Sequence, residues 1–238
     1  MANAWRLTRE RILSEKDVST LVAFLRERAI HASEDSRDAN CLDRLITMSL
    51  VLSGLRNSEF CRLTLGDFRR EDDGWCFVVR ARGDLRRTVY IARTVGGLMS
   101  EYVEGLRPRL LRPGVDSRDC GQPLVINERG RPFDRTGLYR RVVRILTEAG
   151  FGERASVQLL RHTYGYLAYL RTGGNLLFVQ RQLGHAHPRI TSVYAQLVEE
   201  SYPELAERVA TAIDCRPDVP SRKGIAKPHR PRFDCEID

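Results

Sequence analysis

The chain has 238 residues, of which 42% are hydrophobic, so it is long enough to bury a sizeable core and to form one main domain. Its formal net charge of +8 favours a polyanionic partner such as nucleic acid over an acidic small molecule. The sequence shows no signal peptide, and no apolar run reaches the roughly 18 residues that a bilayer requires. These features argue against a secreted or membrane protein and predict a cytoplasmic one.

The basic residues are almost all arginine. Of the 39 lysines and arginines, only Lys16, Lys223 and Lys227 are lysine. The planar, permanently charged fork of arginine suits phosphate oxygens, so the bias fits phosphate binding. It fits a GC-rich coding sequence equally well. The six cysteines are scattered, with no C-x-x-C pair and no histidine at metal-ligand spacing, so we expect neither a metal site nor a disulfide scaffold.

Capping residues and apolar repeats predict helices in the first 65 residues. Ser14, followed by Asp17, begins an amphipathic pattern that continues to Leu25. We expect the polar stretch 31–40 to break this helix before a second one, over 42–50, which ends near Gly54. A short third helix is predicted over 58–65.

A change of period in the next segment predicts a β-hairpin. The runs WCFVVRA (75–81) and RRTVYIA (86–92) are rich in aromatic and β-branched residues and flank the turn RGDL. Helical spacing returns over 98–106. The segment 107–123 is rich in proline and glycine and is expected to be a loop, and 121–133 is expected to contain a short extended piece.

The C-terminal half returns to helical patterns. One helix is predicted over 138–145, with its end at Gly150, and another begins at Val157. The pair Gly173-Gly174 ends that helix, and Asn175 caps the next one.

The last part of the chain changes composition. A final amphipathic stretch is predicted to begin at Pro203, and the charged, proline-rich remainder is expected to be disordered. The chain is therefore predicted to be mainly α with a small antiparallel β-sheet, with one domain over 1–213 and a tail over 214–238.

Three segments, in this order, resemble the tyrosine recombinases, the phage-integrase family. The first is SGLRNSEFCRLTLGDF (53–68), which is similar to the family's T-G-L-R-x-S-E-L-x-x-L-x-x-x-D segment. The second is LLRHTYGYLAYLRTGG (159–174), which is similar to H-x-L-R-H-T. The third is LGHAHPRITSVYAQL (183–197), which is similar to L-G-H-x-x-x-x-T-x-x-Y. The resemblance covers roughly residues 12–213 and implies a catalytic domain that cuts and rejoins DNA.

Metal-free cleavage of a phosphodiester requires a nucleophile, cations that hold the non-bridging oxygens, and a proton donor for the leaving 5′ oxygen. Tyr194 can supply the nucleophile, and Arg56 and Arg161 can neutralise the charge that builds on phosphorus. His185 can donate a hydrogen bond to the phosphoryl group or assist proton transfer. The resemblance implies a 3′-phosphotyrosyl link, which keeps the energy of the broken bond, so no metal or nucleotide cofactor is expected.

Each of these residues is unremarkable when it is considered alone. Arg56 follows a helix end, Arg161 begins a helix, His185 lies in a loop and Tyr194 has the pattern of a core aromatic. Only their joint occurrence at the family's spacing favours the catalytic interpretation. Two other histidines are assigned no such role, because His162 is expected to pack or to hydrogen-bond locally and His187 to lie in a turn.

Two positions depart from the family pattern. The residue three before Arg161 is Gln158, where the family has histidine, and glutamine can hydrogen-bond a phosphate oxygen but cannot exchange a proton near neutral pH. Arg82 aligns with the lysine that serves family members as general acid. Arginine can stabilise a leaving oxygen by its charge but is a poor acid, and general acid catalysis contributes about 10² to 10⁴ in rate. The site is therefore either slow or impaired.

The resemblance also implies partners. Family members carry an N-terminal core-binding domain of about a hundred residues that closes around DNA, and only the first helices precede Arg56 here, so we expect a short form whose missing half a partner supplies. In the family a C-terminal helix docks on a neighbouring protomer in a tetramer on DNA. The apolar strip Leu205, Val209 and Ile213 fits that role or packing on the chain's own core, and the arginines of 222–232 fit either a solvated tail or contacts with the DNA backbone.

Two functions follow from these expectations. The first is site-specific recombination of double-stranded DNA in the cytoplasm, at the nucleoid. The alternative is a recombinase relative that binds DNA or a partner recombinase and cuts slowly or not at all, which Gln158, Arg82 and the absent clamp favour. Retention of Arg56, Arg161, His185 and Tyr194 opposes the alternative, because a protein that only binds does not need all four.

Overall fold

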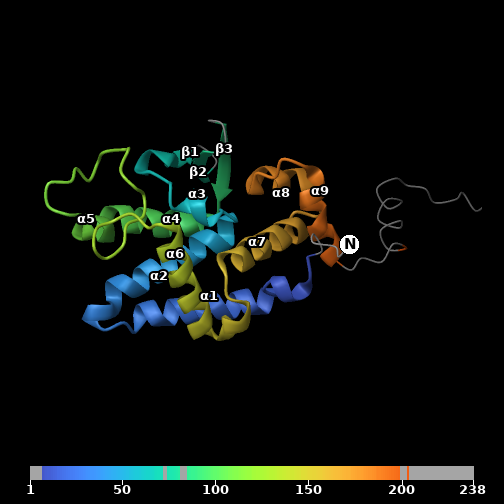
Figure 1. The fold of residues 1–238 in the computed structure, drawn as a ribbon, viewed down its shortest axis with the longest axis horizontal. Helices are drawn as coiled ribbons and strands as arrows, with labels where there is room; N and C mark the ends of the chain where they lie inside the picture. Colours follow the sequence, from blue (N-terminus) through green and yellow to red (C-terminus); the bar gives the residue numbers. More distant parts are fainter. Residues whose placement is uncertain (1–6, 72–73, 81–84, 199–202, 204–238) are drawn as a thin grey trace, which may run out of the picture. The chain divides into compact units, whose positions relative to one another are not determined.

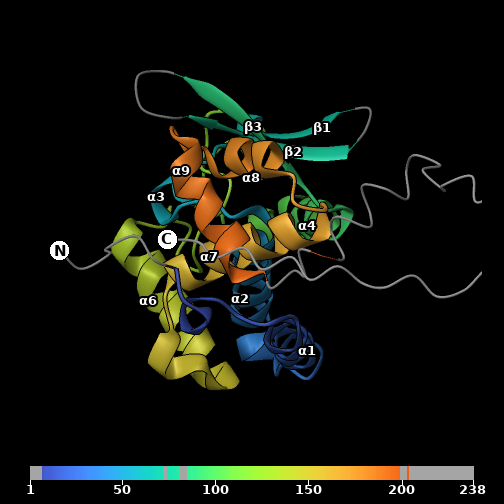
Figure 2. The same ribbon diagram turned by 90° about the vertical axis from the view of Figure 1, so that its right-hand side faces the viewer.

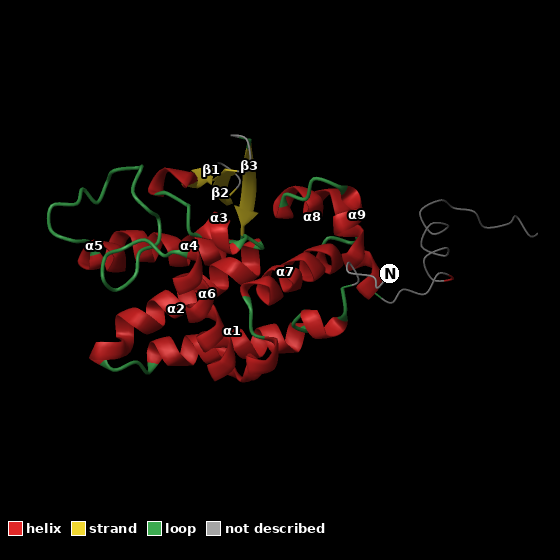
Figure 3. Ribbon diagram, viewed as in Figure 1, coloured by secondary structure: helices red, strands yellow, loops and turns green. Residues whose placement is uncertain are grey.

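A computed structural model describes residues 7–71, 74–80, 85–198 and 203. Most of the described residues are helical, and a three-stranded antiparallel sheet packs against the helices (Figures 1 and 3). The predicted mainly α fold with a small antiparallel sheet is thus confirmed. The predictions for the final amphipathic stretch and for the disordered tail lie outside the described residues.

Two long helices begin the fold. α1 covers Glu15–Ile30, and at its start Ser14 and Asp17 each bond the other's backbone N–H, at 3.1 and 3.0 Å, as their spacing predicts. α2 covers Glu34–Ser53 and ends at Gly54, whose φ of 65° is readily adopted only by glycine. The expected break between the two helices is present but shorter than 31–40, because α2 already begins at Glu34. Acidic residues in the first turn favour a helix start there although the stretch is polar.

The sheet follows a short helix, α3, at Asn57–Phe60. α3 is shorter than the helix predicted over 58–65. A 3₁₀ turn at Leu65–Asp67 leads from it into the sheet. Its strands, in spatial as in sequence order, are β1 (Phe68–Glu71), β2 (Gly74–Arg80) and β3 (Arg86–Ile91). The predicted hairpin corresponds to β2 and β3.

The first strand of the sheet was not predicted from the sequence. β1 is short, and Phe68 is its one residue that is not fully exposed to solvent. The ring of Phe68 stacks on Trp75 of β2, with centroids 4.9 Å apart. This cross-strand contact holds β1 in the sheet. The sequence of β1 has no alternation of apolar and polar residues that would predict a strand.

Helix continues beyond the sheet further than predicted. α4 (Arg93–Glu101), a π-helical turn (Tyr102–Leu106) and α5 (Arg107–Leu110) form one run, so the expected loop begins after 110 rather than at 107. Pro108 lies at the start of α5, directly after the π-helical turn. The buried guanidinium of Arg107 holds the following loop, donating hydrogen bonds to the carbonyl oxygens of Pro123 at 2.9 Å and Leu124 at 3.2 Å.

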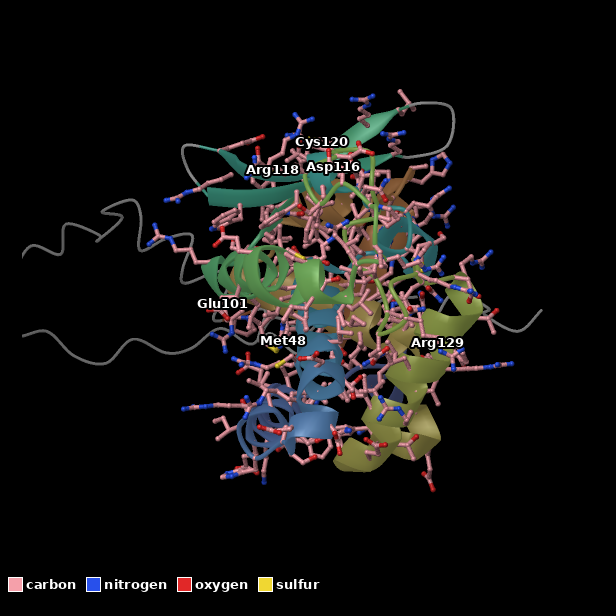
Figure 4. The ribbon with its side chains drawn as sticks, turned by 90° about the vertical axis from the view of Figure 1, so that its left-hand side faces the viewer. Met48, Glu101, Asp116, Arg118, Cys120 and Arg129 are labelled. Carbon is pink, nitrogen blue, oxygen red and sulfur yellow. The ribbon has the colours of Figure 1, made fainter. Side chains whose placement is uncertain are left out.

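This loop lies on the face turned away from α8 and α9, where Figure 4 labels Asp116, Arg118 and Cys120. In the segment predicted to be partly extended, single antiparallel bridges join Thr64 to Pro123 and Ile126 to Pro132. The extended piece is therefore present, although it does not form a strand of the sheet.

The remaining helices follow their predicted capping residues. α6 covers Arg135–Leu146 and continues into a π-helical turn that contains Gly150, with φ of 89°. α7 covers Val157–Arg171, and Gly173 and Gly174 follow it with positive φ. Asn175 caps α8 (Leu176–Leu183), accepting a hydrogen bond from the Phe178 N–H at 2.9 Å. α9 (Pro188–Thr191) and a 3₁₀ helix (Ser192–Leu197) complete the described fold.

Two hydrophobic clusters stabilise the described part. The larger one joins α1, α2, the sheet, α4 and α6 and includes fully buried residues such as Leu42, Ile46 and Phe77. Burying a side chain of this size contributes about 1.5–3 kcal/mol. The smaller cluster joins α7, α8 and the last 3₁₀ helix, which face the viewer in Figure 2. Its buried members are Leu7, Ile12, Ala168, Val179, Leu183, Tyr194 and Leu197.

Among the described residues, no helix combines the length and the apolar character that crossing a membrane would require.

Candidate active site

Most of the predicted site residues line one cavity of about 760 Å³. It lies where the start of α7 meets α3 and the segment that joins α8 to the last 3₁₀ helix. The predicted residues that line it are Arg56, Gln158, Arg161, His185 and Tyr194. Arg82, the sixth, lies outside the described residues.

Arg161 is held by the ends of two other helices. Its side chain is buried, and its Nη1 and Nη2 atoms donate hydrogen bonds to the carbonyl oxygens of Gly54 at 2.5 Å and Leu183 at 2.8 Å. These carbonyls lie at the C-terminal ends of α2 and α8, where the helix dipole favours a cation. Burial, together with the charge of Arg56, lowers the pKa of Arg161 to about 10, so the guanidinium stays protonated at neutral pH.

Arg56 shares a buried carboxylate with Arg87 of β3. The Nη1 atom of Arg56 lies 2.7 Å from Oε1 of Glu59, and both terminal nitrogens of Arg87 reach the same carboxylate, at 2.9 and 3.0 Å. Burial opposes ionisation of Glu59, but the hydrogen bonds and charges of the two arginines lower its pKa to about 2. Two cations therefore surround one anion, and the group keeps a net positive charge. The Nη2 atom of Arg56 also donates to the Gly184 carbonyl, at 3.2 Å.

His185 follows Gly184, which ends α8 in the left-handed conformation. Its Nδ1 lies 2.9 Å from the Thr191 hydroxyl oxygen, a contact that fixes the ring orientation. Burial and the charges of Arg161 and Arg56 lower the pKa of His185 to about 3. The imidazole is therefore neutral at pH 7 and offers one N–H and one lone pair.

Tyr194 is a core residue as well as a residue of the cavity. Its side chain belongs to the smaller cluster and is 1% exposed, and its ring lies nearly parallel to that of His185, with centroids 6.4 Å apart and an interplanar angle of 7°. Burial raises the pKa of Tyr194 to about 12, against the opposing charges of Arg161 and Arg56. The phenol is therefore neutral in the free protein.

Comparison with known proteins identifies the family of this chain. A family model described as "Phage integrase family" matches residues 11–201. The chain belongs to the phage integrase family. Tyrosine recombinase XerH of Helicobacter pylori is 28% identical over 180 residues, which cover 75% of this chain and 47% of that protein. Tyrosine recombinase XerC of Halalkalibacterium halodurans is 30% identical over 189 residues, which cover 78% of this chain and 61% of that protein.

The fold has solved counterparts in the same family. The crystal structure of XerH bound to its difH substrate, in a pre-cleavage complex, superposes with a TM-score of 0.66 at 25% identity and covers 86% of this chain and 55% of that one. The chain thus spans 47% of the length of the first of these relatives and 61% of the length of the second.

The motif that contains Arg161 also places one further side chain, that of His162, in the cavity. Nε2 of Gln158 lies 3.0 Å from Nε2 of His162, one turn later on α7, and Nδ1 of His162 lies 3.2 Å from the Tyr194 hydroxyl. The local hydrogen bond expected of His162 is present, but its contact with Tyr194 was not predicted. Burial, and then the charges of Arg161 and Arg11, lower the pKa of His162 to about 4.

Sequence reasoning missed other residues that shape this phage integrase site. Glu59 and Arg87 set the charge around Arg56, and Thr191 orients His185. Glu59 has a sequence signal, since it lies within the first family motif, whereas Arg87 has none beyond its place in an arginine-rich strand. His187, as expected, lies at a turn, where it is exposed at the start of α9.

The described cysteines are all free thiols, and the described residues contain no group of three or more His, Cys, Asp or Glu side chains arranged to hold a metal ion.

Proposed function

We propose that this chain breaks and rejoins double-stranded DNA at specific sites through a 3′-phosphotyrosyl intermediate on Tyr194. The observation that carries the proposal is the cavity in which Arg56, Arg161, His185 and Tyr194 meet, although they come from separate parts of the chain. Membership of the phage integrase family supports the same reaction, and the XerH structure that superposes with a TM-score of 0.66 is bound to its difH substrate.

In this proposal the arginines stabilise the charge that develops on phosphorus. The hydrogen bonds of Arg161 to two carbonyl oxygens leave further N–H groups for a phosphate oxygen, since a guanidinium has five. The Glu59 carboxylate and Arg87 hold Arg56 in place. Donors that are fixed before the substrate arrives need no reorganisation during the reaction, which is the main source of electrostatic catalysis.

The neutral imidazole of His185 acts as a hydrogen-bond partner of the phosphoryl group rather than as a cation. Its contact with Thr191 orients one nitrogen and leaves the other for the substrate. Gln158 is proposed to contribute a polar group at the mouth of the cavity, where its side chain is exposed. Arg82 is proposed to stabilise the leaving 5′ oxygen by charge, which makes cleavage slow compared with a site that has a lysine acid.

The same proposal includes assembly on DNA. Recombination of two duplexes requires cleavage of several strands, and each cleavage uses one tyrosine nucleophile. We therefore propose that the chain acts either as a homotetramer on DNA or in a complex with a partner recombinase. The alternative of a binding module that never cuts has less support, because the cavity retains the nucleophile together with both clamping arginines.

The experiment that tests the function begins with DNA selected for binding from a random duplex library, since the target sequence is unknown. Selected sites are rebuilt as nicked suicide substrates and incubated with the protein. We expect an adduct that resists SDS in the wild type and is absent from Tyr194→Phe. Binding without any adduct would support the binding module instead.

A matched control is Tyr90→Phe, which removes the hydroxyl of an exposed tyrosine on β3 outside the cavity and should leave adduct formation unchanged. A second substrate separates the role of Arg82. A 5′-bridging phosphorothiolate leaves as a thiolate without a proton, so it should accelerate cleavage if protonation of the leaving oxygen is the slow step. Equal rates on the two substrates would count against that diagnosis.

A further inference from the structure

The Tyr194 hydroxyl has a hydrogen-bonding neighbour that the reaction outlined above does not use. Among the described side chains, His162 is the one within hydrogen-bonding distance of this oxygen, with Nδ1 at 3.2 Å. Its half-buried ring lies between Tyr194 and Gln158, and it follows Arg161 directly on α7. An imidazole at this place touches the atom that would attack phosphorus.

Gln158 determines which nitrogen of His162 carries the hydrogen. Its amide nitrogen lies 3.0 Å from Nε2 of His162, and an amide nitrogen can only donate. With the amide nitrogen as donor, Nε2 is the acceptor, and the single hydrogen of the neutral ring is on Nδ1, directed at the Tyr194 oxygen. The low pKa of His162, about 4, keeps the ring neutral at pH 7. Glutamine does not titrate, so this tautomer is kept as the pH changes.

We propose that His162 is a further catalytic residue, whose Nδ1–H stabilises negative charge on the Tyr194 oxygen, and that Gln158 is a positioning residue that holds the required tautomer. The proposal rests on the function proposed above. A hydrogen bond to a charged oxygen is roughly twice as strong as one to a neutral oxygen, so the contact favours the phenolate over the phenol.

The contact would act in both directions of the reaction. In cleavage, the Tyr194 oxygen forms a bond to phosphorus and the bond from phosphorus to the 5′ oxygen breaks. The phenolic proton passes to a water molecule, the 5′ oxygen takes a proton from water, and the hydrogen on Nδ1 stays on His162. In rejoining, the 5′ hydroxyl gives its proton to water and attacks phosphorus, while Tyr194 leaves as a phenolate to which the same N–H donates.

The first test measures cleavage of a 5′-bridging phosphorothiolate suicide DNA at pH 7, which removes any contribution from the leaving-group acid. His162→Phe keeps a ring but no donor, and we expect cleavage to slow about 10- to 100-fold, the effect of losing a hydrogen bond to a charged group. His162→Asn restores an N–H near the place of Nδ1 and cannot take up a proton. We expect it to recover most of the rate.

Matched controls are His187→Phe and His187→Asn, at the exposed turn outside the cavity, which should cleave like the wild type. DNA affinity and thermal midpoint are measured for every variant, so that a folding defect is recognised. The proposal is overturned if His162→Phe cleaves as fast as the wild type, or if His162→Asn is as slow as His162→Phe, which would indicate proton transfer or packing.

The second test does not depend on activity. Long-range ¹H–¹⁵N spectra of the free protein at pH 7 show which imidazole nitrogen bears the hydrogen. We expect the Nδ1–H tautomer in the wild type and the Nε2–H tautomer in Gln158→Glu, whose carboxylate can only accept. An Nε2–H tautomer in the wild type would overturn the proposal. Absence of any adduct in the wild type, with the Nδ1–H tautomer present, would instead count against the proposed function.

Discussion

Gly165 of α7 lies against the face of the Tyr194 ring. A Cβ atom at this position would come within 2.3 Å of Cζ and 2.6 Å of Cε1, closer than real Cβ contacts, so a glycine is required where the helix passes the tyrosine. This contact explains how a helix and the proposed nucleophile pack together without a gap.

The first prediction follows from this contact. Gly165→Ala should push the ring of Tyr194 out of its place, lower the free energy of unfolding by roughly 1–3 kcal/mol and reduce adduct formation. The measurements are urea denaturation and the suicide-DNA assay. The control is Gly97→Ala in α4, where an added Cβ would meet nothing within 4 Å and alanine should stabilise the helix by up to about 1 kcal/mol. Equal effects of the two substitutions would contradict the prediction.

The second prediction concerns Glu59 and acid. Its pKa is depressed from 4.5 to about 2 in the folded protein, so it contributes stability above pH 4.5, and this contribution is lost as the pH falls towards 2. The depression corresponds to roughly 3 kcal/mol. Glu59→Gln should therefore be clearly less stable than the wild type at pH 7, and the difference should shrink as the pH falls to 2.

Denaturation series between pH 2 and 7 measure this difference. Asp38→Asn is the control, because Asp38 pairs with Arg109 in an exposed ion pair that contributes less than about 1 kcal/mol. A difference between Glu59→Gln and wild type that does not change with pH would refute the assignment.

The third prediction concerns the fork of Arg161. Lysine has one nitrogen and cannot bond the Gly54 and Leu183 carbonyls together, so Arg161→Lys should lose at least about 2 kcal/mol of stability and abolish detectable adduct. Arg171→Lys, at an exposed arginine paired with Glu15, should change stability by less than about 0.5 kcal/mol. Full activity in Arg161→Lys would show that charge alone suffices at this position.

The fourth prediction concerns His185 in the free protein. Burial and the charges of Arg161 and Arg56 lower its pKa to about 3, so NMR titration should find the ring neutral throughout pH 5–8. Removing one of these charges must raise the pKa, because a nearby cation disfavours the imidazolium. Arg56→Ala should therefore shift the titration of His185 upward. A His185 ring that titrates near 6.5 in the wild type would contradict the burial described here.

Local chemistry explains which elements the sequence predicted correctly. The capping residues Ser14 and Asn175 and the helix-ending Gly54 and Gly150 act within a few residues of themselves, so their patterns predict the observed helix ends. β1 and α5 depend on contacts with later segments of the chain rather than on their own residues. Stacking on Trp75 fixes β1, and the carbonyl oxygens of 123 and 124 bind Arg107.

In the site, too, some residues could be predicted from the sequence and others depend on contacts that only the structure shows. Family spacing identified Arg56, Arg161, His185 and Tyr194, and the structure brings them to one cavity. The roles of Glu59, Arg87 and His162 arise from contacts across 28 and 32 positions of sequence, which a pattern of neighbours cannot encode. Gln158 lies beside His162 because the two are four residues apart on one helix. The role proposed for this pair also requires Tyr194, which comes from a later part of the chain.

Under the proposed function, the packing of Tyr194 among Ile12, Val179, Leu183 and Leu197 disfavours cleavage at sites that are not targets. A tyrosine buries about 150–250 Å², so any outward swing of this ring gives up several kcal/mol of packing at about 25 cal/mol per Å². Contact with a single phosphodiester does not provide enough binding free energy to offset this loss of packing, whereas binding of a long duplex by many arginines does. If Tyr194 is the nucleophile, discrimination between chance encounters and a genuine target thus originates partly in the protein's interior.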